Sequence, residues 1–232
     1  MTRIVSVQTG VVRPLMVGDR RVLSAIGKTP VGGAVAVGPL GLAGDEQADP
    51  AYHGGLDKAV YAYPVEHLPT WQRLRRERGV SMFDEPLPFG FVGENLSVEG
   101  LRESEVWIGD EWVIGDLVLR VTAPREPCSK FNAVAGLPDA GRLMVDACNC
   151  GWMSESAHAK VVKTHRPVES TTAVASWNAL TSAGLPSVVS AGPEASLSAI
   201  SRLAIEPDPR RFCSTARSAM FTIWRTLPGQ GA

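Results

Sequence analysis

The sequence lacks most of the features that mark specialised protein classes. Its 232 residues include four cysteines, at positions 128, 148, 150 and 213, which is too few for a disulfide scaffold of this size. No apolar run approaches the length of a membrane span, and the first eight residues alternate like a strand instead of forming a signal-peptide core. The expectation is therefore a reducing, cytoplasmic location without attachment to a membrane.

Excess charge and nucleotide-binding motifs are also missing. The formal net charge is −1 at pH 7, so the chain has no basic excess of the kind that coats nucleic acids or anionic membranes. It contains no P-loop, no G-x-G-x-x-G fingerprint and no H-E-x-x-H motif, which removes the usual support for nucleotide and zincin-type sites. We expect a small-molecule substrate and no nucleic-acid partner.

Turn-forming residues, in contrast, are plentiful. The 23 glycines and 17 prolines favour short strands over long helices. Apolar and polar residues alternate in segments that predict strands at residues 5–11, 21–26, 31–37, 89–98 and 117–122. Two Gly-Asp pairs, at residues 109–110 and 115–116, lie between the last two segments and suit tight connections between strands. Many short strands with such turns are typical of a β-barrel or a β-sandwich.

Two segments read as helical. In residues 64–78, a proline suits the first helical position, Leu68, Trp71 and Leu74 share one helical face, and a glycine follows as a stop. Its basic run is interpreted as a solvated helix face. Residues 130–147 also look helical, with a proline near the start of a second helix. Beyond residue 152, Ser, Thr and Ala dominate, and the sequence predicts no core there.

The most informative segment is 123–130, which places Cys128 between Arg125 and Lys130 after a predicted strand. Two prolines in the segment stiffen the backbone and remove two N–H donors. The flanking cations favour the thiolate, which is the form that attacks electrophiles and binds soft metals. An inert, half-buried side chain is the alternative that these residues leave open.

A second candidate site lies at residues 44–49, which lead into residues 52–63, where a histidine and two glycines precede a lysine. Gly54 and Gly55 allow backbone N–H groups to approach a bound anion, and Lys58 adds positive charge. His53 can donate to a phosphate or an oxo group, or move a proton. A glycine turn with a hydrogen-bonded histidine is the alternative interpretation.

A third candidate is Asn95, which ends a Gly-Glu-Asn sequence. In a strand, such a sequence can mark a β-bulge that turns a polar side chain inward, where its amide can hold a ligand. A turn in which the asparagine caps its own backbone is the alternative. A zinc site from Cys148, Cys150, His158 and His165 fits the spacing of structural zinc templates poorly.

Taken together, several segments resemble the MOSC domain, the fold shared with the C-terminal part of molybdenum-cofactor sulfurases. More narrowly, the chain is similar to the stand-alone bacterial YiiM-like branch of that family. The resemblance extends over residues 1–152. It rests on the order and spacing of residues 44–49, 53–63, 91–96, 108–110 and 124–130.

This resemblance implies a mainly antiparallel β-barrel with a few short helices. It implies that Cys128 is the family cysteine expected to bind molybdenum or carry sulfur, and that the cofactor is the molybdenum cofactor, a molybdenum–pterin. The family is also associated with pyridoxal phosphate binding. The YiiM-like branch is associated with reducing N-hydroxylated compounds such as hydroxylaminopurines, with electrons from a separate reductase.

The hypothesis assigns roles to particular residues. Cys128 and His53 are the catalytic candidates, with Cys128 as metal ligand and His53 as the acid when oxygen is removed from the substrate. The candidate cofactor-binding residues are Gly54, Gly55, Lys58, Asn95, Arg125 and Lys130. A non-catalytic carrier of the cofactor or of sulfur is the alternative function.

The sequence departs from the YiiM-like pattern after Gly151 and Trp152. Residues 153–157 do not fit the strand that normally follows, so we expect a barrel with an unpaired edge. Codons for Met-Ser-Glu-Ser-Ala, read with one extra base in front, can encode Tyr-Val-Arg-Val-Arg, which is close to the expected strand. The hypothesis is therefore a frameshift near residue 152, with a barrel domain at 1–152 and a divergent, poorly ordered tail at 153–232. An inactive frameshifted product is a further alternative.

Overall fold

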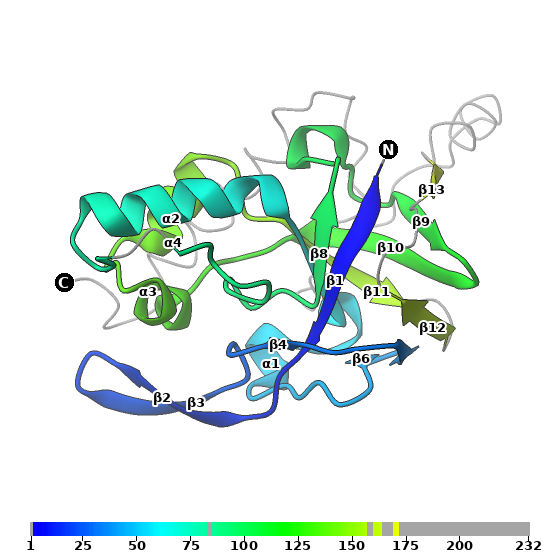
Figure 1. Ribbon diagram of the computed structural model, residues 1–232. Coiled ribbons are helices and arrows are strands. Elements are labelled where there is room, and N and C mark those ends of the chain that lie inside the picture. Colours follow the sequence, from blue (N-terminus) through cyan, green and yellow to red (C-terminus); the bar gives the residue numbers. More distant parts are fainter. Residues whose placement is uncertain (1, 83–84, 157–159, 164–168, 172–232) are drawn as a thin grey trace, which may run out of the picture.

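The structure is a computed structural model that describes residues 2–82, 85–156, 160–163 and 169–171. The chain is mainly β, with a few short helices between the strands (Figure 1). The strands are β1 (Arg3–Thr9), β2 (Arg13–Val17), β3 (Arg20–Ser24), β4 (Thr29–Pro30), β5 (Ala34–Gly38), β6 (Gly41–Leu42), β7 (Val60–Pro64), β8 (Leu96–Glu99), β9 (Glu111–Ile114), β10 (Leu117–Pro124), β11 (Trp152–Ser156), β12 (Lys160–Lys163) and β13 (Glu169–Thr171). The α-helices are α1 (Pro50–His53), α2 (Leu68–Glu77), α3 (Ser129–Ala135) and α4 (Ala140–Asp146), and the 3₁₀ helices are η1 (Leu56–Lys58), η2 (Val65–His67) and η3 (Glu103–Glu105).

Eight strands form one large sheet in the order β13-β9-β10-β11-β7-β8-β1-β4. Every described pair in it is antiparallel except β7 with β8, which run parallel. A three-stranded sheet, β12-β5-β6, and a two-stranded ribbon, β2-β3, contain the remaining described strands. The expected Gly-Asp turn is confirmed at Gly115, which has a positive φ of 66° between β9 and β10.

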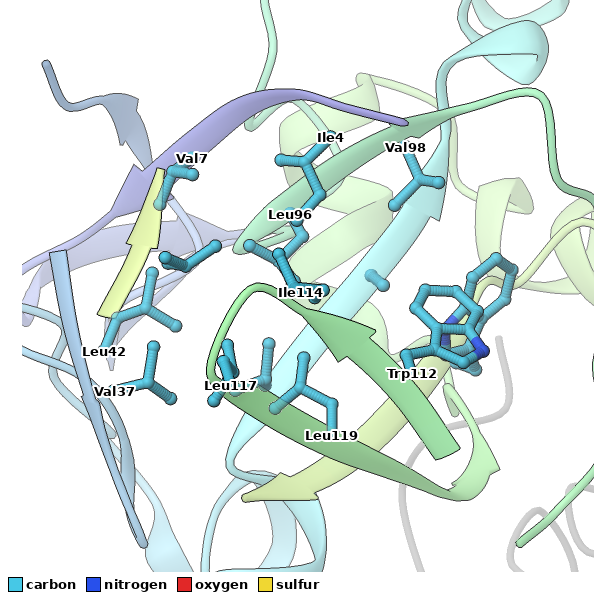
Figure 2. Close-up of a cluster of buried hydrophobic side chains, with 14 of the residues drawn as sticks. Ile4, Val7, Val37, Leu42, Leu96, Val98, Trp112, Ile114, Leu117 and Leu119 are labelled. Atoms are coloured by element: carbon cyan, nitrogen blue, oxygen red, sulfur yellow. The ribbon is translucent and has the colours of Figure 1, made fainter. Parts of the chain in front are cut away.

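The large sheet curls around an apolar cluster, the barrel core, which the three-stranded sheet helps to close. Figure 2 shows Val37 and Leu42 of the smaller sheet in the same cluster as Leu117 of β10. Trp112 and Trp152 pack edge-to-face, with their ring centroids 4.8 Å apart. The MOSC-type barrel that the resemblance implied is therefore present.

A second apolar cluster, the helix-side core, involves helices α2, α3 and α4, which gather on one side of the large sheet in Figure 1. Trp71 of α2 packs edge-to-face on Phe131 of α3, with ring centroids 5.2 Å apart, and donates to the Tyr63 hydroxyl at 2.7 Å. The predicted amphipathic helix is confirmed, but it begins at Leu68 because Val65–His67 forms a 3₁₀ turn first.

The strand predicted at residues 89–98 is shorter than expected. Only β8 forms, because Gly90 and Gly93 have φ values of 88° and 87°, which turn the chain before it. Buried Glu94 fixes this turn by accepting hydrogen bonds from the Gly90 amide at 2.7 Å and the Val92 amide at 3.2 Å. The glycine-rich stretch is therefore a carboxylate-held loop and not a strand with a bulge.

The segment after Gly151 contradicts the expectation of an unpaired barrel edge. Trp152–Ser156 forms β11, which pairs antiparallel with β10 on one side and with β7 on the other. The strand forms because its ladder uses backbone N–H and C=O groups, which the divergent side chains leave intact. A barrel strand therefore does follow Gly151, and the prediction of an unpaired edge there was wrong.

The paired region also continues past residue 152. Strand β12 pairs with β5, and β13 pairs with β9. The remainder of the predicted divergent tail, with the weak zinc candidates His158 and His165, lies outside the described residues. Within the described ranges, no helix combines the length and the apolar character needed to cross a membrane.

Candidate functional site

A cavity of about 120 Å³ lies where the loop after β10 meets α1, η1 and the start of β8. Its lining includes most of the residues predicted from the sequence, namely His53, Lys58, Asn95, Arg125, Cys128 and Lys130. Gly54 and Gly55 are outside this lining. The topology thus brings together side chains from three segments that are far apart in the sequence.

Cys128 lies in this cavity immediately before helix α3, with extended backbone angles of φ −132° and ψ 178°. Burial opposes ionisation of its thiol. A hydrogen bond with the His53 side chain, the positive charge of Arg125, an electrostatic interaction with His53 and a hydrogen bond from the Lys130 amide outweigh that effect. Together these groups lower the pKa of Cys128 to about 6. The thiolate is therefore the main form at neutral pH.

His53 is positioned by the turn that follows it. It is the exposed last residue of α1, and it lines the cavity together with Cys128. A Cβ at Gly54 would come within 2.2 Å of the Gln47 side-chain oxygen, so a larger residue there would displace the Gln47 side chain. That same oxygen accepts from the Gly55 amide at 3.0 Å. The glycine pair therefore forms a turn held by Gln47, and the Gly55 amide is not free to bind an anion.

Arg125 is held against two aromatic rings. Its guanidinium carbon lies 5.4 Å from the Tyr61 ring centroid and 5.5 Å from that of Phe131. Its backbone amide donates to the Gly151 carbonyl at 3.1 Å, which fixes the loop to the start of β11. No carboxylate forms an ion pair with Arg125 in the described part of the chain, so its charge acts on the Cys128 thiol and the cavity.

Two lysines in the lining have different surroundings. The Lys58 ammonium group donates to the Tyr52 carbonyl at 3.0 Å and lies 3.4 Å from the Glu126 carboxylate. Lys130 has no carboxylate within ion-pair distance among the residues that the structure describes. Lys130 is therefore the better placed of the two to bind an anionic group, because the charge of Lys58 is partly balanced.

A buried polar cluster in the cavity wall joins Asp45 and Asn95, which lie in the predicted candidate segments, to Lys28, which the sequence did not indicate. The Asp45 carboxylate accepts from the Lys28 ammonium group at 2.5 and 2.7 Å, from the Gly10 amide at 2.7 Å and from the Asn95 amide group at 2.8 Å. The side chains of Lys28 and Asp45 are each only 9% exposed. Burial lowers the pKa of Lys28, although Asp45 opposes this. No motif around Lys28 signalled its position.

Asn95 uses its side chain within the protein. Its carbonyl oxygen accepts from the Tyr61 amide at 3.1 Å, and its amide group donates to the Gln8 carbonyl at 3.3 Å as well as to Asp45. These bonds connect β7, β1 and the cavity wall. Asn95 therefore shapes the cavity, and its polar atoms are already engaged.

The geometry and the family comparison agree. Residues 49–169 match the MOSC domain, so the chain belongs to the MOSC domain family. It is 38% identical to Protein YiiM of Escherichia coli (strain K12) over 146 residues, which is 63% of each chain. The crystal structure of YiiM from Geobacillus stearothermophilus aligns with a TM-score of 0.56 and 32% identity, covering 74% of this chain and 76% of that chain. The chain is therefore a YiiM-like MOSC protein.

Two of the similar proteins extend well beyond the matched region. The alignment covers just under two thirds of the Escherichia coli protein, 63% of its length. A protein named Reductase from Gibberella moniliformis (strain M3125 / FGSC 7600) is 34% identical over 132 residues, which are 56% of this chain and 22% of that protein. Since MOSC domains are associated with the molybdenum cofactor, a function associated with that cofactor follows for this chain.

Proposed function

We propose that this protein is a molybdenum-cofactor-dependent reductase that converts N-hydroxylated compounds, such as hydroxylaminopurines, to amines. The observation that carries the proposal is the Cys128 thiolate, which shares one cavity with His53, Arg125 and Lys130. A thiolate is a soft ligand, and cations around it favour a ligand that carries negative charge. An inert, packed cysteine would be neither ionised nor surrounded by cations.

The donor set of the cavity suits the molybdenum cofactor. The described residues contain no group of three or more His, Cys, Asp and Glu side chains that could hold a metal ion, and Cys128 is the thiol that lines the cavity. Such a site suits a metal whose other ligands come from an organic cofactor. Cys128 would bind the metal, while Arg125 and Lys130 would hold anionic groups of the pterin. Lys58 would contribute less because of Glu126.

The overall conversion is R–NHOH + 2 e⁻ + 2 H⁺ → R–NH₂ + H₂O. When bound, the cofactor supplies the two-electron chemistry. His53 is the proposed proton donor because it lines the cavity together with Cys128, while its exposure gives it access to solvent protons. The engaged residues, Asn95 and Gly55, are proposed to shape the site without contacting the reacting atoms.

We propose that the electrons come from a separate reductase. In the Gibberella protein named Reductase, a similar segment occupies only 22% of a longer chain. The rest of that longer chain lies outside the alignment, which supports an electron source outside the segment that the two proteins share.

The test uses full-length protein from a molybdenum-replete host and compares Cys128→Ser with Cys150→Ala as the matched control. Wild type and Cys150→Ala are expected to contain molybdenum and to reduce a hydroxylaminopurine with dithionite-reduced methyl viologen. Cys128→Ser is expected to lose both. A Cys128→Ser protein that kept molybdenum and full activity would refute the ligand assignment.

Two other results would favour the alternatives. Molybdenum in the wild type without turnover supports a non-catalytic carrier of the cofactor. A wild type that neither binds molybdenum nor turns over substrate supports an inactive product.

A further inference from the structure

The ribbon formed by β2 and β3 presents a face that the proposed site does not use. Figure 1 shows it as a two-stranded arm at the lower edge of the molecule, separate from the large sheet. Met16 pairs with Arg21 across the ribbon, and Pro14 pairs with Leu23. Directly paired residues share a face of a sheet, so these four side chains point the same way. All four are exposed, with Met16 at 57% and Leu23 at 59%.

The other face of the ribbon belongs to the fold. Leu15 pairs with Val22, and both side chains are half-buried, while Ser24 at the end of the ribbon is buried. Strand β2 also packs near helix α3. The ribbon thus packs on the fold through one face, and its apolar outer face is exposed to solvent. Exposed apolar surface costs free energy, and a binding partner would remove this cost by covering it.

The charge of the ribbon defines the kind of partner. Arg21 lies on the outer face, whereas Arg13 and Arg20, which pair with Ser24 and Val17, belong to the other face. All three arginines are exposed, and no carboxylate forms an ion pair with them in the described part of the chain. The single acidic residue of the ribbon is Asp19, at its turn. Methionine and arginine are enriched in the centres of protein interfaces, and arginines complement an acidic surface. A second copy of this chain that docked through the same ribbon face would instead bring like charges together.

The ribbon leads directly into the cavity. Strand β3 ends at Ser24, and Ser24, Ala25 and Ile26 line the cavity together with Cys128. Helix α3, which packs near β2, begins immediately after Cys128. A protein bound to the outer face of the ribbon would therefore lie beside the cavity and not at a remote part of the surface.

We propose that this ribbon face, formed by Pro14, Met16, Arg21 and Leu23, is the docking surface for an acidic electron-transfer protein. The proposal rests on the proposed reductase function, which requires electrons from outside the chain. Two electrons leave the reduced flavin or iron–sulfur group of the partner, and with two protons they convert the hydroxylamine to the amine and water. The basic ribbon would orient the partner, and its apolar side chains would hold it beside the cavity.

The experiment measures hydroxylaminopurine reduction by the full-length, molybdenum-loaded protein. The rate is compared between a small chemical electron donor and a protein electron donor. Dithionite-reduced methyl viologen is a small donor that needs no docking surface, whereas flavodoxin reduced by its NADPH-dependent reductase is an acidic protein donor. The test variant is Met16→Ala/Arg21→Glu/Leu23→Ala. The matched control is Arg73→Glu, which makes the same charge change at an exposed arginine of α2.

With methyl viologen, all three proteins are expected to turn over at rates within about twofold of each other, because exposed substitutions seldom disturb a fold. With flavodoxin, the ribbon variant is expected to lose about tenfold or more in kcat/KM, and the wild-type rate is expected to fall as salt is raised. The Arg73→Glu protein should retain the wild-type rate with both donors.

Each contrary result has a distinct meaning. Equal rates of ribbon variant and wild type with flavodoxin, or a wild type that flavodoxin cannot reduce, overturn the docking proposal and leave the proposed function standing. A wild-type dimer that the ribbon substitutions dissociate in sedimentation also overturns it, in favour of a second copy of the chain. Absence of wild-type turnover with methyl viologen overturns the proposed function, and the docking proposal with it.

Discussion

The cavity around Cys128 and the packed interior around Cys150 shift the pKa of a cysteine thiol in opposite directions. Both thiols are sheltered from water, and Arg125 favours ionisation of both. Burial nevertheless raises the pKa of Cys150 to about 12, with Glu103 adding to the effect. At Cys128, hydrogen bonds with His53 and the Lys130 amide help to lower the pKa to about 6. Hydrogen-bond donors aimed at the sulfur, more than a nearby charge, distinguish the two sites.

Two other buried polar groups, Asp45 in the cavity wall and Ser154 in the barrel core, also differ in their hydrogen-bond partners. In the cavity wall, the buried Asp45 carboxylate has donors from Lys28, Gly10 and Asn95. In the barrel core, the Ser154 hydroxyl is buried with no hydrogen-bond partner among the described residues. A buried polar group with partners can be stable, whereas one without partners costs free energy. The cavity wall therefore provides hydrogen-bond donors for its buried carboxylate, whereas the Ser154 hydroxyl has none among the described residues.

The largest expected difference is in the reactivity of the two cysteines. At pH 7.5, we expect iodoacetamide to alkylate Cys128 faster than Cys150 by at least on the order of 10³-fold, because only the thiolate reacts. Peptide mass spectrometry of the native protein over time measures both rates. Comparable alkylation rates at Cys128 and Cys150 would contradict the opposite pKa shifts of the two thiols.

The next largest effect concerns the buried ion pair. Asp45→Asn removes the charged partner of buried Lys28, so we expect it to destabilise the protein by about 3–5 kcal/mol. Glu99→Gln, which affects an exposed pair with Arg3, is the control and should cost only about 0–1 kcal/mol. Urea unfolding monitored by tryptophan fluorescence measures both. Equal effects would mean that the cavity wall does not depend on this pair.

The role of His53 gives a smaller effect. His53→Gln removes a group that stabilises the thiolate, so the midpoint of Cys128 alkylation should move to higher pH. At pH 6.5 the rate should fall by about tenfold. His67→Gln is the control, since His67 binds Glu103 and does not line the cavity. An unchanged midpoint in His53→Gln would assign the ionisation to Arg125 and the Lys130 amide.

The smallest effect is expected in the barrel core. Ser154→Ala removes an unpartnered buried hydroxyl and should raise the stability by about 1 kcal/mol. Ser97→Ala is the matched control, because the Ser97 hydroxyl bonds to Glu94 at 2.9 Å and to Gln8 at 3.0 Å. That variant should lose about 1–3 kcal/mol. Thermal unfolding compares the two, and a loss of stability in Ser154→Ala would show that its hydroxyl is satisfied.

The sequence predicted those features of the fold that depend on local signals. The helix containing Leu68 and Trp71 follows from its apolar spacing, and the turn at Gly115 follows from a Gly-Asp pair. Strand β11 was missed because its formation depends on backbone pairing with β7 and β10, which are distant in the sequence. The frameshift hypothesis stays a prediction that the nucleotide sequence of the gene tests.

The candidate site, like the fold, was predictable where neighbouring residues in the sequence carry the signal. The flanks of Cys128 predicted an ionised thiol, and the charge of Arg125 does lower the pKa of Cys128. Lys130 acts through its backbone amide and not through its charge. The contacts of Gly55 and Asn95 were not predictable, since Gln47 and Tyr61 reach them only in the folded chain. Flanking sequence can indicate a charge, but it does not show which hydrogen-bonding groups remain available to a ligand.

The pH dependence of Cys128 alkylation tests the central claim most directly. A lowered pKa keeps the thiolate present as the pH falls, so the rate should stay near its maximum from pH 8 to 7 and decline through a midpoint near the pKa of about 6. Peptide mass spectrometry of wild-type protein quenched at each pH gives this curve. A midpoint at about 8.5, the ordinary value for a cysteine, would contradict the account.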